Sequence, residues 1–583
     1  MANLIDEAKT QIHTLLAAAS RAAAEAGEFP AGTELTGSVE IPKDIRNGDY
    51  AANHAMASAK ALHMAPRKIA ETLVKYLPLE GSFFSSAEIA GPGFLNFRVS
   101  DRWFAAVLEA VEAEGAEYGR SDKRTGEKVM VEFVSANPTG PMTIGNARGG
   151  VLGDTLATVL DLAGCDVYRE FYVNDAGNQV DKFGRSLDAR YTELLSGDGN
   201  VQANYQKILD LRAADSDWEG FPEDAYHGAD IIDLALEIIE KDGDKYLSLP
   251  EEERKNAFIS YGLPKNIELM KQHLLRYGIR FDNWFLESTL HESGYVKETV
   301  DLLTEGGHTY EQDGALWLRN TDFGAEKDEV LRRANGFYTY YAVDIAYHRN
   351  KFIQRGFDRV IDVWGADHHG HAIRFGKSMT APELGLQGRK LDFLIMQMVR
   401  LVRDGETIKV SKRSGKALTL NDLLDEIGVD PCRFFFNAKP DTHLEFDLDL
   451  AVRQDSENPV YYVQYAHARI CSLLATLAEE GHSVPKSADA DLSLLKEEQE
   501  KDLIRQISAF PEEIMLAARD YDPSRINRYA VELAARFHRF YNTCRCRDAE
   551  DSIRDARLVL CDAARCVIAN ALAILGVSAP EKM

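Results

Sequence analysis

The stretch KVMVEFVSANPTGPMTIGNARGG, residues 128–150, decides the fold of the central part of the chain. It begins with a β-rich apolar run and passes through a glycine-containing loop. The helical pattern that follows places Val151, Leu152, Thr155, Leu156, Val159 and Leu160 on one face. Gly164 ends this helix, and the strand-like CDVYREFYV follows. Strand, loop, helix and strand in this order predict a βαβ unit of a doubly wound, Rossmann-like parallel sheet.

The loop at residues 135–150 has the physical properties of a phosphate or nucleotide site. Because it leaves a strand and enters a helix, its backbone amides and the helix dipole face the edge of the sheet. Its glycine spacing matches neither GxGxxG nor GxxxxGK[ST], so neither standard nucleotide fingerprint applies. A glycine-rich turn without a ligand fits the loop by itself equally well.

Outward from this unit, the chain divides into several domains, as its 583 residues lead us to expect. Helical stripes alternate with strand-like SVEIP and GPGFLNFRV before it, and the sheet pattern resumes at residues 359–371 and 393–411. After Pro431 the pattern is almost entirely helical. The predicted architecture is a multidomain α/β chain: an α+β domain at 1–118, a parallel-sheet domain at 119–420 with an acidic, mostly helical insertion at about 187–324, a connecting segment at 421–457 and an all-α domain at 458–583.

Composition restricts the class and the compartment. Hydrophobic residues make up 45% and charged residues 27%, which indicates globular domains. The net charge of -26 argues against a protein covered in basic charge, although local basic stripes stay possible. Seven cysteines, an odd and small number, suit a reducing compartment. We find no signal peptide and no apolar run long enough to span a membrane, so we expect a cytoplasmic protein without membrane association.

Two further motifs suggest nucleotide chemistry. KVSKRSGK, residues 409–416, surrounds a Ser-Gly loop with three lysines and Arg413, directly after a predicted hairpin turn at Asp404-Gly405. Mobile ammonium groups suit a polyphosphate, whereas the alternative is a solvated basic loop. GADHHGH, residues 365–371, follows a predicted strand, where ligands of open α/β sheets bind. No cysteine or carboxylate recurs at ligand spacing around its histidines, so we favour hydrogen bonding to a nucleoside over a metal.

Two sets of side chains could recognise charged groups. Glu132 lies in the first strand, and Tyr340 and Asp344 share one face of a predicted helix. Such carboxylates can bind a guanidinium bidentately, or form a structural salt bridge. Near the C-terminus, seven arginines against three acidic residues between Arg519 and Arg547 suggest a nucleic-acid face, with a solvated helix as the alternative. The predicted stripe consists of Arg525, Arg528, Arg536 and Arg539.

Together these motifs resemble class I aminoacyl-tRNA synthetases. TIGN at residues 143–146 occupies the position of the HIGH motif, and KVSKR at residues 409–413 that of KMSKS. The surroundings VEFVSANPTGP, WGADHHGH and NPVYYVQYAHAR are similar to bacterial arginyl-tRNA synthetases, and the resemblance runs the full length of the chain.

The resemblance implies an activity and partners. The chain would activate L-arginine with ATP to arginyl-adenylate and transfer it to the 3′ end of tRNA(Arg). Mg²⁺ would accompany ATP as part of the substrate, and no tightly bound metal is expected. The N-terminal domain would contact the outer corner of tRNA, and the helical domain would bind the anticodon. The resemblance also suggests a monomer.

Residue roles follow from the resemblance position by position. Amino-acid-binding residues would be Glu132, Ser135, Asn137, Tyr340, Asp344 and His368. ATP-binding residues would be Pro138, Gly145, Asn146, Gly365, Asp367, Val410 and Lys412. Catalytic residues would be Lys409, Lys412, Thr143 and Asn146, and tRNA-binding residues the four arginines of the stripe.

The sequence departs from the family pattern where both histidines of HIGH are replaced, by Thr143 and Asn146. Both replacements can donate hydrogen bonds, but neither can carry a positive charge. Loss of such a donor can cost roughly 10²–10³ in rate. The alternative interpretation is therefore a tRNA-binding paralogue with weak or no catalysis. The lysine loop and the pair of carboxylates argue for the enzyme.

Overall fold

The computed structural model describes residues 2–197, 199–214, 216–408, 418–438 and 442–583. The chain forms two compact units. We call residues 124–452 and 521–524 the catalytic unit, after the role that the family resemblance implies for them, and residues 1–123, 453–520 and 525–583 the terminal unit.

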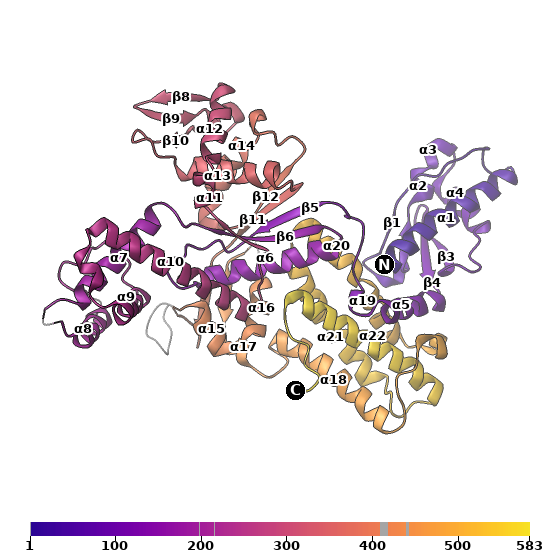
Figure 1. The fold of residues 1–583 in the computed structure, drawn as a ribbon. Coiled ribbons are helices and arrows are strands. Elements are labelled where there is room, and N and C mark those ends of the chain that lie inside the picture. The colour runs from indigo at the N-terminus through magenta and orange to yellow at the C-terminus, as the bar shows by residue number, and fades with distance from the viewer. Residues whose placement is uncertain (1, 198, 215, 409–417, 439–441) are drawn as a thin grey trace. The chain divides into compact units, whose positions relative to one another are not determined.

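A five-stranded sheet with the order β12-β11-β5-β6-β7 is the centre of the catalytic unit (Figure 1). All four pairings are parallel, which confirms the predicted doubly wound sheet. The chain builds β5, β6 and β7 toward one edge and then returns to place β11 against the other side of β5. The order of the strands therefore reverses between β5 and β11, which is where open α/β sheets form a binding crevice. The strands are β5 (Lys128–Glu132), β6 (Asp166–Val173), β7 (Asn283–Leu286), β11 (Arg359–Gly365) and β12 (Lys390–Met396).

The register of these strands sets three acidic residues side by side. Glu132 of β5 pairs with Glu170 of β6 on one side and with Asp362 of β11 on the other. Residues in register on neighbouring strands point to the same face of the sheet. Glu132 is 6% exposed, and Glu170 and Asp362 are 0% exposed, so three carboxylates share one buried strip. We call Glu170, Glu132 and Asp362 the acidic row.

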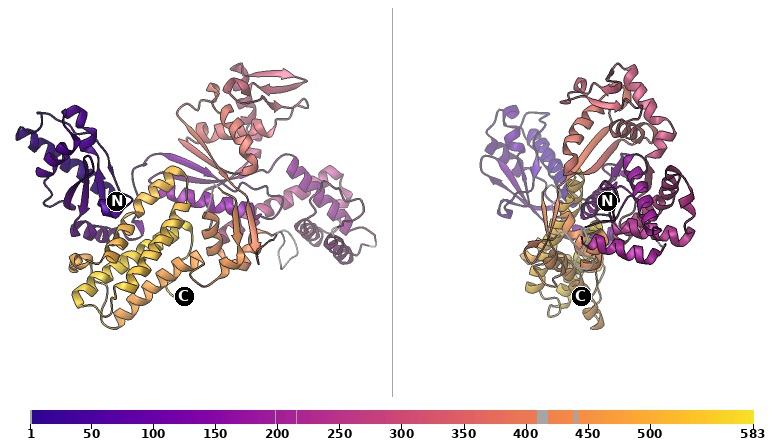
Figure 2. Two further views of the ribbon diagram at one scale, coloured as in Figure 1. Left: turned by 180° about the vertical axis from the view of Figure 1, so that it is seen from behind. Right: turned by 90° about the vertical axis from the view of Figure 1, so that its left-hand side faces the viewer.

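Helix α6 (Ile144–Leu162) lies against the sheet, where it packs on β5, β6 and β11 (Figure 2). Close packing depends on glycines along its inner face. A Cβ added to Gly153 would lie 2.2 Å from the ring of Phe133, and one added to Gly150 would lie 2.8 Å from Ile279. The helix can therefore approach the end of β5 only because these positions have no side chain.

The predicted insertion differs from the structure in its second half. Its first part is helical, as predicted, but β7 within it is an edge strand of the central sheet. Beyond it, β8, β9 and β10 form an antiparallel sheet, in which Leu316 and Leu318 alternate inward on β9. These strands are only four residues long, too short to produce a clear alternation in the sequence. The elements are α7 (Asn178–Leu194), α8 (Val201–Ala213), α9 (Ala229–Asp242), α10 (Glu251–Arg276), α11 (Ser288–Glu292), α12 (Tyr295–Glu305), β8 (Thr309–Gln312), β9 (Ala315–Leu318) and β10 (Glu329–Arg332).

The rest of the catalytic unit carries the helix with Tyr340 and Asp344, and the predicted hairpin. The hairpin joins β13 and β14, and its turn residues Asp404 and Gly405 have φ angles of 50° and 76°, so the turn prediction is confirmed. One strand, β15, interrupts the helices expected after Pro431. The elements are α13 (Tyr340–Arg349), a π-helical turn (Asn350–Gln354), α14 (His369–Ser378), β13 (Val399–Arg403), β14 (Glu406–Thr407), α15 (Leu420–Ile427), α16 (Val429–Asn437), β15 (Leu444–Asp447) and α17 (Leu448–Val452).

The terminal unit combines an antiparallel sheet of order β1-β2-β4-β3 with helices from both ends of the chain. Helix α5 packs against α19 and α22, and the Tyr118 hydroxyl donates to the carbonyl of Ile507 at 3.2 Å. The N-terminal elements are α1 (Leu4–Glu25), β1 (Val39–Glu40), β2 (Tyr50–Ala52), α2 (His54–Ala57), α3 (Ala59–Leu62), α4 (Pro66–Lys75), β3 (Phe84–Ala90), β4 (Phe94–Val99) and α5 (Asp101–Glu114). The C-terminal helices are α18 (Pro459–Glu479), α19 (Glu498–Ser508), α20 (Phe510–Asp520), α21 (Ser524–Thr543) and α22 (Asp551–Leu575).

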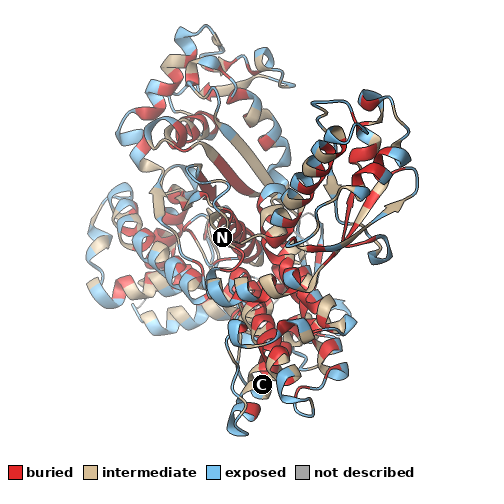
Figure 3. Ribbon diagram, turned by 90° about the vertical axis from the view of Figure 1, so that its right-hand side faces the viewer, coloured by how far each residue is buried: buried red, intermediate tan, exposed pale blue. Residues whose placement is uncertain are grey.

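Helix α22 is long and apolar enough to cross a membrane by length and composition alone, with a mean hydropathy of 2.0 over its most apolar window. However, 67% of that window is buried inside the protein. Figure 3 shows buried positions on the inward faces of the C-terminal helices. We therefore interpret α22 as a core helix of the terminal unit.

The contact between α6 and Phe133 can be tested by adding a methyl group. We expect Gly153→Ala to lower the free energy of unfolding of the catalytic unit by about 1–3 kcal/mol, because the added Cβ overpacks the helix–sheet contact. Gly145→Ala on the same helix is the control, since its nearest neighbour to an added Cβ is Thr143 Oγ1 at 3.7 Å. Urea unfolding followed by circular dichroism measures both. Equal midpoints for the two variants would contradict the packing argument.

Candidate active site

A cavity of about 1790 Å³ opens at the carboxyl ends of β5 and β11. It exceeds the roughly 300–1,000 Å³ of a typical single-ligand pocket, so it has room for more than one substrate. Residues of α8, of α9 and of the segment between them also line it. The predicted site residues that line the cavity are Glu132, Ser135, Asn137, Thr143, Gly145, Asn146, Tyr340, Asp344, Gly365, Asp367 and His368.

Among the described residues, one predicted site residue of the catalytic unit does not line the cavity. Pro138 is not among the lining residues, and its carbonyl accepts a hydrogen bond from Asn266 Nδ2 at 2.9 Å. Lys409, Val410 and Lys412 lie outside the described residues.

The turn that follows β5 bends the chain into the cavity. Val134 and Ser135 have φ angles of 69° and 41°, which are unusual for residues other than glycine and strained for a β-branched valine. The turn brings the Ser135 hydroxyl back to Glu132, where it donates to Oε1 at 2.8 Å. The same oxygen of Ser135 accepts from the backbone N–H of Tyr172 at 3.1 Å. Ser135 therefore fixes one oxygen of Glu132 at the wall of the cavity.

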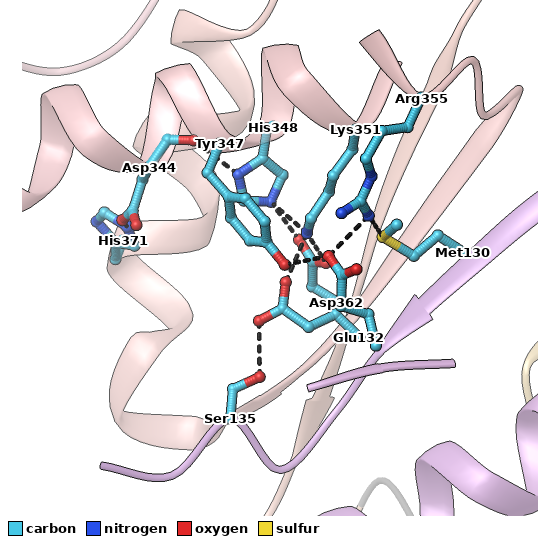
Figure 4. Close-up of polar contacts among 11 residues, drawn as sticks. Met130, Glu132, Ser135, Asp344, Tyr347, His348, Lys351, Arg355, Asp362 and His371 are labelled. Carbon is cyan, nitrogen blue, oxygen red and sulfur yellow. Dashed lines mark hydrogen bonds and ion pairs between the residues drawn. The ribbon is translucent and has the colours of Figure 1, made fainter. Parts of the chain in front are cut away.

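The second oxygen of Glu132 contacts a buried lysine (Figure 4). Lys351 Nζ lies 2.6 Å from Glu132 Oε2 and 2.9 Å from Asp362 Oδ1, and the Lys351 side chain is 0% exposed. Burial raises the pKa of Glu132, and the charge of Lys351 opposes that rise. Burial acts in the same direction on Asp362, but the charges of Lys351 and His348 outweigh it and lower the pKa of Asp362 to about 2.

Helix α13 carries Asp344, which lines the cavity, and the buried residues Tyr347 and His348, about one turn further along the helix (Figure 4). Asp344 Oδ2 lies 3.1 Å from His371 Nε2, and the Asp344 carbonyl accepts from His348 Nδ1 at 2.8 Å. His348 Nε2 in turn lies 2.6 Å from Asp362 Oδ2. Tyr340, one turn before Asp344, is 65% exposed. The predicted pairing of Tyr340 and Asp344 on one helix therefore places both at the cavity.

TIGN forms the first turn of α6. Thr143 is the N-cap residue, and its Oγ1 accepts from the Asn146 backbone N–H at 3.3 Å. Asn146 Oδ1 accepts from the Thr143 N–H at 2.9 Å and from the Thr143 hydroxyl at 2.8 Å. This is a capping box, which satisfies backbone donors that would otherwise lack partners. The Asn146 side-chain NH₂ and the backbone N–H of Gly145 take no part in the capping box, and both residues line the cavity.

The four predicted tRNA-binding arginines lie on α21 of the terminal unit. Arg525 contacts Glu513 and Asp520 at 3.4 and 3.3 Å, and Arg536 contacts Asp502 at 2.9 Å. Arg539 also contacts Asp502, at 3.3 Å, but its side chain is 60% exposed. Arg528 is exposed as well. The stripe is thus partly neutralised by acids, and its exposed charge lies at Arg528 and Arg539.

The residues of the site that were not predicted from the sequence include Lys351, Asp362, His371 and His348. A signal for the first two existed in the sequence. Asp362 interrupts the apolar strand VIDVW, and Lys351 lies seven residues after Asp344, two turns further along the same helical face. His371 belongs to the GADHHGH motif, but its contact with Asp344 depends on the packing of α14 against α13.

Comparison with known families defines the class of protein. The model for the arginyl tRNA synthetase N terminal domain matches residues 9–99, and that for the DALR anticodon binding domain matches residues 463–583. The model for the tRNA synthetases class I (R) catalytic domain matches residues 108–433, more than half of the chain. Together with the parallel sheet and the cavity at the point where its strand order reverses, these matches define a class I aminoacyl-tRNA synthetase.

Individual relatives define the family. The arginine–tRNA ligases of Caldanaerobacter subterraneus subsp. tengcongensis and Acetivibrio thermocellus are 50% and 48% identical to the chain over 584 residues, covering 100% of each. The chain belongs to the arginyl-tRNA synthetase family. A solved structure of a putative arginyl-tRNA synthetase from Campylobacter jejuni is 32% identical with a TM-score of 0.72, and covers 83% of this chain and 100% of that one. The arginyl-tRNA synthetase of Thermus thermophilus, 22% identical with a TM-score of 0.67, shares the fold over 99% of this chain and 100% of its own.

Substitution of Thr143 tests whether the capping box organises the loop for catalysis. We expect Thr143→Val to slow adenylate formation, because it removes both the N-cap acceptor and the hydroxyl that holds Asn146; loss of a cap costs about 0.5–2 kcal/mol. Thr143→Ser keeps both hydrogen bonds and is the matched control. Pyrophosphate exchange with tRNA present measures the rate. If the valine variant is as fast as the serine variant, the cap does not organise the loop for catalysis.

Proposed function

We propose that the cavity of the catalytic unit performs both steps of the family's reaction. The chain is an arginine–tRNA ligase: ATP activates L-arginine to arginyl-adenylate with release of pyrophosphate, and the arginyl group is then transferred to the 3′ end of tRNA(Arg). The observation that carries the proposal is that Glu132 and Asp344 line the same cavity as the first turn of α6. This places anionic groups for a guanidinium close to a helix N-terminus that suits a phosphate.

In this proposal the side chain of arginine lies between Asp344 and Glu132. Asp344 offers a carboxylate held on one side by His371, and Tyr340 stands beside it on α13. Glu132 offers Oε1, whose orientation Ser135 fixes. A planar guanidinium can donate to several such acceptors at once, whereas the ammonium of lysine cannot match that fork. Buried polar contacts of this kind discriminate strongly, so no editing domain is required.

The remaining groups would bind the backbone of arginine and ATP. Ser135, Asn137 and His368 would orient the α-amino and carboxylate groups, or the ribose. Gly145, Asn146, Gly365 and Asp367 would contact adenine and ribose, and Mg²⁺ would enter with ATP. Lys409 and Lys412 would bind the β- and γ-phosphates, with Val410 between them; all three lie outside the described residues. Positioning and charge neutralisation then suffice, without a covalent nucleophile.

The second candidate, a tRNA-binding paralogue without catalysis, was suggested by the altered TIGN motif alone. Full-length identity near 50% to arginine–tRNA ligases supports the enzyme over that candidate. Aminoacylation of purified tRNA(Arg) with arginine and ATP tests it directly. Tight binding of tRNA without charging and without pyrophosphate exchange would overturn the catalytic assignment.

We also propose a compartment, an oligomeric state and a domain division for the enzyme. We place it in the cytoplasm as a monomer without membrane association, and keep the domain division at residues 118, 420 and 457. The terminal unit would bind tRNA through the N-terminal α+β domain and the C-terminal helices, to which the match with an anticodon-binding domain lends support.

If Asp344 binds the guanidinium group, Asp344→Asn should weaken the binding of arginine but not that of ATP. The KM for arginine should rise by roughly 10–100-fold, because one charge-assisted hydrogen bond of about 1.5–3 kcal/mol is removed. The KM for ATP should stay close to that of the parent and serves as the internal control. Steady-state pyrophosphate exchange at varied arginine and ATP gives both constants. An unchanged arginine KM would remove Asp344 from the pocket.

If the exposed arginines of the stripe bind tRNA phosphates, their replacement should change how the affinity for tRNA depends on salt. Replacement of Arg528 and Arg539 by Gln should weaken tRNA binding and reduce the slope of log K against log salt by about 0.7–0.9 for each phosphate that the variant no longer neutralises. The pair Arg525→Gln and Arg536→Gln should have a smaller effect, because their side chains are only 28% and 22% exposed and so are less accessible to a phosphate. Filter binding at several salt concentrations measures the slopes. Equal slopes for both pairs and the parent would place the tRNA surface elsewhere.

A further inference from the structure

The three carboxylates of the acidic row can stay ionised in the core of the catalytic unit only if cations lie beside them. Glu170, Glu132 and Asp362 stand in register on three neighbouring strands, and all three are buried. Adjacent carboxylates in a buried site cannot all stay ionised without cations, because each raises the pKa of the next. If the charges were left unpaired, at least one carboxyl group would take up a proton at neutral pH.

Two cations contact the acidic row from one segment, which is the π-helical turn after α13 together with the residue that follows the turn. Lys351 lies within the turn, and Arg355 directly follows it. Arg355 Nη2 donates to Glu170 Oε1 at 2.7 Å, and Glu170 also accepts from Tyr347 and Asn283 at 2.6 and 2.9 Å. At the other end of the row, His348 contacts Asp362. Glu170 and Asp362 therefore each have a partner besides Lys351.

Glu132, the middle member of the row, depends on Lys351. Among the described residues, Lys351 is the cation in direct contact with Glu132, at 2.6 Å, and the other contact of Glu132 is the neutral Ser135. Glu132 is also the member of the row that lines the cavity. Figure 4 shows Lys351 on the side of Glu132 away from Ser135, so the two partners hold the carboxylate from opposite sides.

We propose that Lys351 is a positioning residue that keeps Glu132 ionised and holds Oε2, so that Oε1 is presented as an anionic acceptor and the pocket selects a guanidinium over a neutral group of the same shape. This rests on the proposed function, in which Glu132 contacts the side chain of arginine. Lys351 touches no substrate in this scheme. It acts through Glu132.

The chemistry of an isosteric competitor makes the proposal specific. Citrulline carries a ureido group in place of the guanidinium, with an oxygen acceptor where arginine has an N–H donor. An ionised Glu132 only accepts hydrogen bonds, so it favours arginine and repels the ureido oxygen. A protonated Glu132 can donate its O–H to that oxygen. The charge of Glu132 therefore sets the preference between the two amino acids.

The groups around Glu132 fix the sign of the pH effect. Its own turn contributes Ser135, β11 contributes Asp362, β6 contributes Glu170 and Tyr172, and the helical side contributes Tyr347, His348 and Lys351. Without Lys351, burial and the charge of Asp362 act to raise the pKa of Glu132, and the charge of His348 opposes them. Arginine binding needs the ionised form, so it is present above that pKa and lost below it. Removal of Lys351 therefore moves the loss of binding to higher pH.

The test uses Lys351→Met in the full-length enzyme, assayed by pyrophosphate exchange with tRNA present. We expect the acid limb of kcat/KM for arginine to move to higher pH, the KM for arginine near pH 7 to rise by roughly 10-fold or more, and the ratio of arginine to citrulline activation to fall. The KM for ATP should change little. Lys255→Met is the matched control: Lys255 is also buried, and it contacts Asp181 and Glu252 at 2.6 and 2.7 Å on the helical insertion. It should leave the acid limb and the selectivity unchanged.

A second variant separates charge from packing. Lys351→Met combined with Asp362→Asn removes a carboxylate together with the lysine, so Glu132 has one negative neighbour fewer. We expect the acid limb to return part of the way toward that of the parent. A purely structural role of Lys351 predicts the opposite, a double variant at least as impaired as the single one. The double variant also keeps the test usable if Lys351→Met does not fold.

Glu132→Gln distinguishes the pocket assignment from the role of Lys351. If it leaves the KM for arginine unchanged, the assignment of Glu132 to the pocket fails. If it raises that KM while Lys351→Met leaves both the acid limb and the arginine-to-citrulline ratio at parental values, the pocket stands and the role of Lys351 is overturned.

Discussion

The acidic row is the constraint on which the rest of the catalytic unit depends. Parallel pairing of β6, β5 and β11 puts Glu170, Glu132 and Asp362 in one buried line, and a buried carboxylate is costly unless it is paired. The helix above the sheet meets this demand: α13 supplies His348, and its π-helical continuation supplies Lys351 and Arg355. Because Asp344 and Tyr340 belong to the same helix, the contacts that neutralise the core also fix the position of the groups that face the cavity. Stability and recognition therefore share one set of contacts.

The site combines strong fixed charge on the side of the amino acid with neutral donors on the side of the nucleotide. In the TIGN turn, the hydrogen bonds of Thr143 and Asn146 close a capping box, so the turn organises a helix N-terminus without adding a side-chain cation. Positive charge toward the phosphates then has to come from the dipole of α6 and from residues elsewhere in the chain. In the terminal unit, too, the positive charge of the arginines is limited. Arg525 and Arg536 contact acidic residues, which limits how strongly the basic stripe can attract any polyanion.

Much of the architecture could be predicted from local patterns. Residues 128–173 carry strand, loop, helix and strand within a short range, and Asp404-Gly405 has the turn chemistry that a tight hairpin requires. Tyr340 and Asp344 were found because helical spacing is visible in the sequence. The strand β7 was missed because four residues show too little alternation. The contact between Lys351 and Glu132 joins residues 219 positions apart, and it follows from strand register and helix packing, neither of which local pattern encodes. The assignments on residues 409–413 stay predictions, because they lie outside the described residues.

The π-helical turn at Asn350–Gln354 has a consequence for how this region can vary in length. A π-turn inside a helix holds one more residue than the regular geometry, and it commonly arises from a single inserted residue. Deletion of one residue there would allow α-geometry to continue, but it would rotate the following side chains by about 100° about the helix axis. Lys351 or Arg355 would then leave the carboxylates that they contact. Single-residue deletions, which the surface loops of the insertion can absorb, are therefore excluded at this point of the catalytic unit.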